Sequence, residues 1–287
     1  MSSPAIAIIS PGDMGHVVGG VLNQRGFKTL TALEGRSELS RLRAERAMIS
    51  DVGQLKNLIS EANILLSIMP PQHAIEFASK VSKQILKEGG DVVFADCNAI
   101  SPDTTLSIAE LIKNVGAKFL NVGIIGPPPG RGVKTKFYAS GQYVETLEFI
   151  NRDTMELVPM GDDIVKASAI KMCYAALTKG TMTLHASVLT AAELLGVSQE
   201  LQNEFKESQK FHWEAMCKRV STLACDAGRW ADEMDQISET FASIGLTKNL
   251  HKGAADVFRS LNRSPLSKET RETYDKGRTM QQSIRIY

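Results

Sequence analysis

Short apolar runs alternate with helical patterns along the first half of the chain. A polar helix is predicted over residues 37–46, and another helix is predicted to start at Ser101-Pro102-Asp103, which combines an N-cap serine with a first-turn proline. Strands alternating with helices predict βαβ units and a mainly parallel sheet. The strands are expected where apolar residues follow one another, at residues 5–9, 27–33, 63–69, 91–96 and 118–122, with short antiparallel additions at 135–139 and 155–158.

The pattern changes at Gly161. Residues 162–195 are apolar, almost free of proline and helical in period, with Gly180 as the one interruption. A helix of about 30 residues would span roughly 45 Å, which is too long for a crossover inside one domain. We therefore expect it to link two domains or to cross a partner subunit. The residues after it have helical patterns, with breaks expected near Gly228, Gly245 and Pro265.

These two patterns predict two domains. We expect a Rossmann-type, doubly wound α/β domain over residues 1–161 and an all-helical domain over residues 162–287, with the long helix at 162–195 as its first element. A chain of 287 residues is long enough to give each domain a core of its own.

Composition narrows the classes of protein. Lysine and arginine (33 residues) nearly balance aspartate and glutamate (32 residues), so no overall field favours nucleic acid or an anionic membrane. No apolar run has the length of a membrane-spanning helix. We expect free thiols, no bound metal and a soluble cytoplasmic protein, because the four cysteines lack metal-ligand or Cys-x-x-Cys spacing: Cys97, Cys173, Cys217 and Cys225.

The first strand runs directly into a tight turn that contains two glycines. Unpaired N–H groups at the start of the following helix suit a dinucleotide pyrophosphate. Gly12 would let the backbone approach the phosphates, and Gly15 would let the helix pack against the strand. A turn kept for packing alone is the alternative, since a serine replaces the first fingerprint glycine. The cofactor-binding turn is predicted to comprise Ser10, Pro11, Gly12, Asp13, Met14 and Gly15.

Together with later motifs, this turn resembles the β-hydroxyacid dehydrogenase superfamily, which includes 3-hydroxyisobutyrate and 6-phosphogluconate dehydrogenases. The resemblance covers nearly the whole chain, and its C-terminal part looks like a less characterised branch with its own helical domain. It implies a nicotinamide cofactor and hydride transfer. The motifs that carry it beyond the turn are Met69-Pro70-Pro71, Asp96-Cys97-Asn98, the loop from Gly123 to Gly130, and Lys171 on the long helix.

The residues after the second predicted strand bear on the choice of cofactor. Glu34 stands near the position of the acidic residue that selects NAD in this fold. Arg36 and Ser37 follow it and could hold a 2′-phosphate, so NADP(H) is favoured and NAD stays possible. A solvated basic helix face is the alternative for the arginines that come next, and the nicotinamide end is expected to lie against Met69, Pro70 and Asn98.

Lys171 is the candidate for proton transfer. A lysine between Ile170 and Met172 in an apolar helix must reach solvent, find a partner or lose its charge. The resemblance implies that it exchanges a proton with the substrate oxygen during hydride transfer. The neighbouring Lys166 and Lys179 are expected at the domain surface.

The substrate residues depart from the family pattern. Where the family has an asparagine four residues after the lysine, this chain has Ala175, and Thr178 replaces a glutamate proton donor of the phosphogluconate branch. A decarboxylating mechanism is therefore doubtful. Three successive prolines also remove backbone donors from the loop that holds a carboxylate in the family. The remaining candidates for substrate contacts are Gly123, Ile125, Gly126, Arg131, Tyr174 and Thr178.

Three functions follow from these observations. An NADP(H)-dependent oxidoreductase that interconverts a small hydroxy acid, or a related alcohol, and its carbonyl form is favoured. Imine reduction or reductive amination on the same fold is a second hypothesis, and a non-catalytic NADP-binding sensor is a third. The long apolar helix would expose much hydrophobic surface in a monomer, so we expect a homodimer with intertwined helical domains.

Overall fold

A computed structural model describes residues 3–287, and the chain divides into two compact units. The first ends at Met172 and the second extends from Cys173 to Tyr287. The division falls within the long helix α6 (Lys166–Leu195). A domain boundary at residue 161 stays a prediction. No helix among residues 3–287 is long and apolar enough to cross a membrane.

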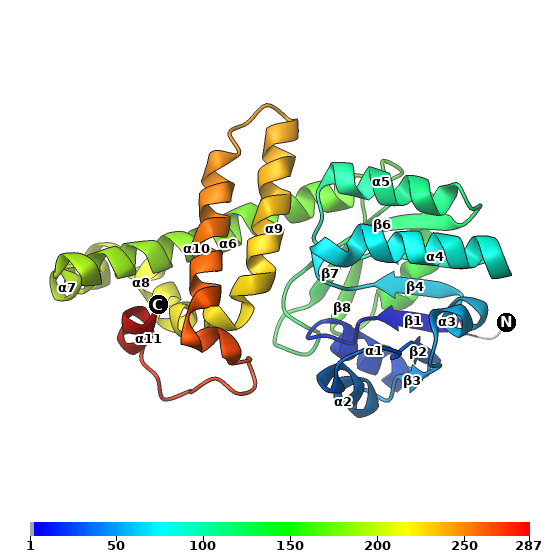
Figure 1. Cartoon of the computed structure of the whole chain (residues 1–287), viewed down its shortest axis with the longest axis horizontal. Helices are drawn as coiled ribbons and strands as arrows, with labels where there is room; N and C mark the ends of the chain where they lie inside the picture. The colour runs from blue at the N-terminus through cyan, green and yellow to red at the C-terminus, as the bar shows by residue number, and fades with distance from the viewer. Residues whose placement is uncertain (1–2) are drawn as a thin grey trace. The chain divides into compact units, whose positions relative to one another are not determined.

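The first unit is built on one sheet, which has eight strands among the described residues (Figure 1). The order β3-β2-β1-β4-β5-β6-β7-β8 places the first six strands parallel to their neighbours. β7 pairs antiparallel with β6, and β8 pairs parallel with β7. The predicted doubly wound α/β sheet is confirmed. Its strands are β1 (Ile6–Ile9), β2 (Thr29–Thr31), β3 (Ser50–Asp51), β4 (Ile64–Ser67), β5 (Val93–Asp96), β6 (Lys118–Ile125), β7 (Thr135–Ser140) and β8 (Met155–Pro159).

Helices cover both faces of this sheet. Successive strand residues point to opposite sides, and both sides carry apolar residues that have to be buried. On one face, Ile8 and Leu66 belong to a core that includes Val18 of the first helix. On the other, Phe94 and Phe119 stack with ring centroids 6.1 Å apart. The helices are α1 (Gly15–Gln24), α2 (Glu38–Arg46), α3 (Leu55–Glu61), α4 (Ala74–Glu88) and α5 (Pro102–Lys113), with short 3₁₀ turns η1 (Pro71–His73) and η2 (Val144–Ile150).

The second unit is helical. The predicted break at Gly228 is wrong, because α9 runs through it. A β-carbon at Gly228 would lie 2.9 Å from the side-chain oxygen of Asn262, so this glycine allows the helix after it to pack closely. Breaks do occur at Gly245, which has a φ of 79°, and at Pro265. After α6 come α7 (Ser198–Ser208), α8 (Lys210–Arg219), η3 (Val220–Thr222), α9 (Ala224–Ser243), α10 (Asn249–Arg263), η4 (Pro265–Lys268) and α11 (Met280–Ile286).

The first two turns of α6 lie directly against β6. A β-carbon on Gly123 would stand 2.4 Å from the carbonyl oxygen of Ala167 and 3.1 Å from the β-carbon of Lys171. Such a contact is impossible without a shift of the helix, so only glycine permits this approach. The amide of Asn121 donates to the carbonyl of Ile164 at 2.8 Å, and the hydroxyl of Ser140 donates to the same carbonyl at 3.0 Å. The lysine helix is thus held to the sheet by backbone contact and by two side-chain hydrogen bonds.

Gly123→Ala is expected to destabilise the protein by about 1–3 kcal/mol, since the added methyl group overpacks the contact with Ala167. Gly180→Ala is the matched control. Gly180 lies inside the same helix, and a β-carbon added to it would have no other atom within 4 Å, so alanine there should stabilise by about 0.5–1 kcal/mol. Denaturant unfolding measures both changes, and equal stability of the two variants would contradict the proposed tight contact.

Candidate functional site

The turn after β1 is shaped by its glycines and by a strained serine. Ser10 has a φ of 64°, and its carbonyl accepts a hydrogen bond from the N–H of Gly12 at 2.7 Å. A β-carbon on Gly15 would lie 2.5 Å from that same carbonyl oxygen and 3.3 Å from Ile8, so α1 starts in contact with the strand. At Gly12 the nearest atom to such a β-carbon is 3.9 Å away. Gly12 therefore leaves open backbone at the surface of the turn, which fits the close approach of a phosphate.

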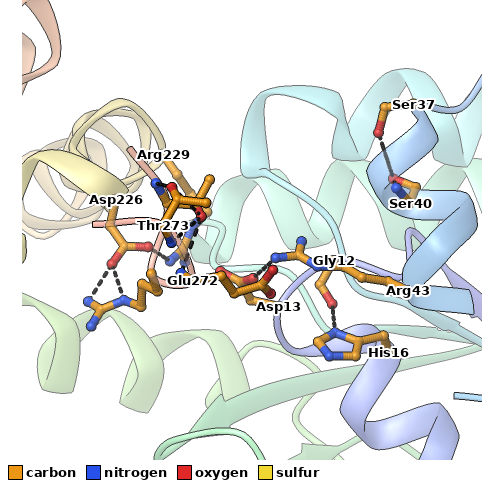
Figure 2. A network of polar contacts seen from close by, with 12 residues as sticks. Gly12, Asp13, His16, Ser37, Ser40, Arg43, Asp226, Arg229, Glu272 and Thr273 are labelled. Atoms are coloured by element: carbon orange, nitrogen blue, oxygen red, sulfur yellow. Dashed lines mark hydrogen bonds and ion pairs between the residues drawn. The ribbon is translucent and has the colours of Figure 1, made fainter. Parts of the chain in front are cut away.

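The start of α1 carries a compensated charge. His16 contacts the carbonyl of Gly12 through its backbone N–H (3.1 Å) and its ring Nδ1 (2.5 Å). The carboxylate of Asp13 pairs with Arg43 of α2 at 2.5 Å, as Figure 2 shows. An unpaired carboxylate here would repel an anionic ligand. The ion pair with Arg43 neutralises it, so the N-terminus of α1 remains suited to an anion.

The loop after β2 presents the residues expected to discriminate between cofactors. Glu34 and Ser37 are exposed and Arg36 is half-buried. The carboxylate of Glu34 accepts from the amide of Gln54 at 3.2 Å. Ser37 caps α2 by accepting the N–H of Ser40 at 3.3 Å (Figure 2).

Two arginines of α2 make contacts with neighbouring segments of the first unit. Arg41 donates to the carbonyl of Leu33 at 2.5 Å, and the Arg43 side chain is 13% exposed in its pair with Asp13. They tie α2 to the end of β2 and to the glycine turn. The alternative of a solvated basic face is therefore wrong for Arg43, whereas Arg41 is exposed although its guanidinium group contacts the backbone. Arg36 lies before α2 and is half-buried.

The loops after β4 and β5 are joined by Asn98. This residue is 2% exposed. Its side-chain oxygen accepts the N–H of Met69 at 2.7 Å, and its side-chain amide donates to the hydroxyl of Ser67 at 3.1 Å. The N–H of Asn98 in turn donates to the carboxylate of Asp96 at 2.9 Å. Asn98 thus fixes the backbone at Met69. Its predicted contact with the cofactor stays a prediction.

Lys171 lies near the end of the first unit, and it is half-buried. Its ammonium group donates to the carbonyl of Ile124 at 2.6 Å, beside the close contact at Gly123. The lysine therefore has found a partner at the carboxyl end of β6, which is one of the three outcomes expected for a lysine in this apolar helix. Gly123 and Ile125 are buried within β6, so the exposed loop begins one residue later than Ile125.

The remaining substrate candidates are more exposed. Gly126 and Arg131 lie at the surface of the proline loop, whose Pro127 carbonyl accepts the hydroxyl of Thr135 at 2.6 Å. Tyr174 and Thr178 follow on α6 in the second unit, and the hydroxyl of Thr178 donates to the carbonyl of Tyr174 at 3.0 Å. The structure therefore brings Lys171 and β6 together, whereas the substrate roles of the other residues stay predictions.

The surroundings of one lysine of α6 differ from those predicted. Lys179 is buried and pairs with Glu233 of α9 in the second unit, whereas a surface position was expected. Glu233 also accepts from Arg229 at 3.0 Å. Arg229 donates to Asp226 at 2.8 Å (Figure 2). These charges stabilise one another inside the helical unit. No group of three or more histidine, cysteine or acidic residues among residues 3–287 is placed to hold a metal ion.

The family described as the NAD binding domain of 6-phosphogluconate dehydrogenase matches residues 5–148. The chain belongs to this family. A second family, a domain of unknown function (DUF1932), matches residues 192–261 within the helical unit. The protein is therefore β-hydroxyacid dehydrogenase-like, with an NAD-binding first unit and a helical C-terminal part, as the sequence motifs predict.

Known proteins with the same architecture have different activities. A curated relative from Methanothermus fervidus, an uncharacterized 28.5 kDa protein in the 7S RNA 5′ region, is 25% identical over 234 residues, which are 80% of this chain and 88% of the relative. The structure of 3-hydroxyisobutyrate dehydrogenase from Salmonella typhimurium has a TM-score of 0.72 at 13% identity and covers 99% of this chain and 100% of its own. A Streptomyces aurantiacus imine reductase has a TM-score of 0.55 at 16% identity and covers 89% of this chain and 93% of its own. These structures share the fold.

Proposed function

We propose that this β-hydroxyacid dehydrogenase-like protein is an NADP(H)-dependent oxidoreductase that interconverts a small hydroxy acid, or a related alcohol, and its carbonyl form. The observation that carries the proposal is the position of Lys171, whose ammonium group is held at the carboxyl end of β6 by the carbonyl of Ile124. Ligands of doubly wound sheets bind at this edge. Membership in an NAD-binding family supports the cofactor class.

In this proposal the residues of the chain divide the work between binding and proton transfer. The backbone N–H groups after Gly12 bind the pyrophosphate, and Met69 and Pro70 line the nicotinamide end. The nicotinamide cofactor held there would supply the hydride chemistry at the substrate carbon. As a neutral amine, Lys171 takes the hydroxyl proton during oxidation, and as an ammonium group it returns that proton during carbonyl reduction. This role fits a proton-carrying Nζ that lies at the end of β6.

Arg36 is proposed to bind the 2′-phosphate of NADP(H), with Ser37 as a second donor. Arg36→Ala is expected to weaken NADPH binding about tenfold to a hundredfold, since a charge-assisted hydrogen bond contributes about 1.5–3 kcal/mol. NADH binding should stay unchanged. Calorimetric titration of both cofactors measures the ratio.

Glu34→Gln is the matched control for the cofactor measurement, because it removes a charge from the same loop. It should leave NADPH binding intact. If Glu34→Gln instead weakens NADH and Arg36→Ala has no effect on NADPH, then Glu34 binds the ribose and the protein uses NAD.

Lys171→Ala is expected to lower turnover by about 10²–10⁴-fold through loss of acid–base catalysis, while cofactor affinity changes little. Lys166→Ala, on the same helix and exposed, is the control and should keep full activity. The assay follows NADPH oxidation with panels of keto acids and aldehydes. Full activity of Lys171→Ala would refute its proposed role.

Imine reduction is the second candidate function, and the fold shared with an imine reductase supports it. The three successive prolines leave the substrate loop poor in backbone donors, which suits a less anionic substrate than a hydroxy acid. Adding imines to the same NADPH assay separates the two reactions. No turnover of either panel, together with intact NADPH binding, would favour the non-catalytic sensor.

We also propose a homodimer formed through α6. Within the second unit this helix exposes Leu177 (73%), Leu184 (62%) and Leu195 (76%), which lie along one face at helical spacing. A second copy of this face would remove these side chains from water, and the cost of leaving a contiguous apolar stripe exposed favours such pairing.

Leu184→Asp is expected to convert the dimer to a monomer of 31.3 kDa, because a carboxylate would be buried unpaired in the interface. Leu86→Asp is the control, since Leu86 is 76% exposed on α4 of the first unit. Light scattering measures both masses. A monomeric wild type at micromolar concentration would contradict the proposal.

A cytoplasmic location is proposed from the state of the thiols. The four cysteines are all free, and two of them, Cys173 and Cys217, are exposed. Exposed free thiols persist in a reducing compartment, whereas secreted proteins tend to pair them.

A further inference from the structure

Three polar residues stand side by side in the interior of the sheet. Ser67 of β4 pairs in register with Asp96 of β5, which pairs in register with Asn121 of β6. Parallel neighbours in register point to the same face, here the face that carries Phe94 and Phe119. Ser67, Asp96 and Asn121 are 0%, 0% and 1% exposed. A carboxyl group therefore lies in an apolar layer beside a primary amide.

The hydrogen-bond donors around this pair leave two oxygens without a partner. Oδ1 of Asp96 accepts the N–H of Asn98, but Oδ2 has no partner among residues 3–287. The amide nitrogen of Asn121 donates to the carbonyl of Ile164 and to the hydroxyl of Ser168 at 3.1 Å, while its Oδ1 has no donor in the same part of the chain. Two buried acceptors thus stand on adjacent strands, and each lacks a hydrogen.

Rotating the side-chain amide of Asn121 by a half-turn would not give its oxygen a hydrogen-bond donor. Its oxygen would then face the carbonyl of Ile164, which is itself only an acceptor. The orientation of Asn121 is therefore fixed by the carbonyl of Ile164, just before α6, and the missing hydrogen has to come from the neighbouring strand.

We propose that Asp96 is protonated in the folded protein and that its carboxyl O–H donates to Oδ1 of Asn121. A single proton, bound to Oδ2 of Asp96 and donated to Oδ1 of Asn121, then gives both oxygens a hydrogen-bond partner. Burial raises the pKa of Asp96 to about 7, against the smaller opposing effect of its bonds with Asn98, and no charged side chain contributes to that shift. The adjacent Cys97 thiol has its pKa raised by burial and by Asp96, while β4, β6 and α6 present the non-titrating Ser67, Asn121 and Ser168.

This proton would complete a chain of hydrogen bonds from the carboxyl ends of β4 and β5 to β6. Asn98 binds Met69 and Asp96, and Asn121 binds Ser168 in the first turn of α6. The proposed bond from Asp96 to Asn121 would join these two parts. Lys171 follows Ser168 by three residues on that helix. Resting on the proposed function, Asp96 is then a positioning residue that joins the loop of the nicotinamide end to the helix of the proton-transferring lysine.

Carbon-13 NMR of aspartate carboxyl groups tests the protonation in the wild-type protein without cofactor or substrate. One carboxyl resonance should titrate with a midpoint of about pH 7, should vanish in Asp96→Asn, and should persist in Asp103→Asn, which changes an exposed aspartate of α5. A resonance of Asp96 that titrates near the ordinary value of about 4 would overturn the proposal, whether or not the protein proves to be an oxidoreductase.

The coupling is tested by the backbone amides of Met69 and Ser168. In the wild type their resonances should shift with the same midpoint as the Asp96 carboxyl, and in Asp96→Asn, whose side-chain NH₂ replaces the O–H donor, they should stay constant. A merely structural aspartate would not move both loop and helix amides together. Amide resonances of Met69 and Ser168 that do not shift as Asp96 titrates would refute the positioning role.

Stability against pH gives an independent measurement. The folded protein holds the Asp96 proton more tightly than the unfolded chain, so the free energy of unfolding should fall as the pH rises from about 4 towards 7. This contribution should be absent from Asp96→Asn and present in Asp103→Asn. An unchanged pH dependence in Asp96→Asn would contradict a protonated Asp96.

Discussion

The close packing of α6 on β6 is the constraint on which the rest of the first unit depends. Gly123 has no side chain, and the backbone of Ala167 occupies the space that a β-carbon would need. Asn121 and Ser140 then hold the same helix through the carbonyl of Ile164. Because a rigid helix carries its residues at fixed spacing, this contact places Lys171 at the carboxyl end of the sheet.

The same edge of the sheet gathers the other features that suit a dinucleotide. Gly12 leaves the backbone open at the end of β1, and Asn98 fixes Met69 at the end of β4. Charges are compensated where they would oppose binding, as in the ion pair of Asp13 with Arg43. The groups that an oxidoreductase of this kind requires thus lie in the turns that directly follow the strands, where hydrogen bonds and ion pairs fix their positions.

Sequence patterns predicted the parts of the structure that depend on local chemistry. The glycine turn, the Ser101 cap and the long α6 all appear. β3 was missed because its two residues, Ser50 and Asp51, are exposed and polar. Gly228 was misread because a glycine inside a helix can serve packing between helices as well as end one. The pairing of Asp96 with Asn121 could not be predicted, since it depends on strand register.

A crystal structure of the protein with NADP⁺ is the most direct test of the central claim, that Lys171 and the loop at Met69 form one nicotinamide site. The account predicts the nicotinamide ring beside Met69 and Pro70, with Nζ of Lys171 facing the space next to its reactive carbon, and the 2′-phosphate on Arg36. A dinucleotide bound with its nicotinamide directed away from Lys171 would contradict the account.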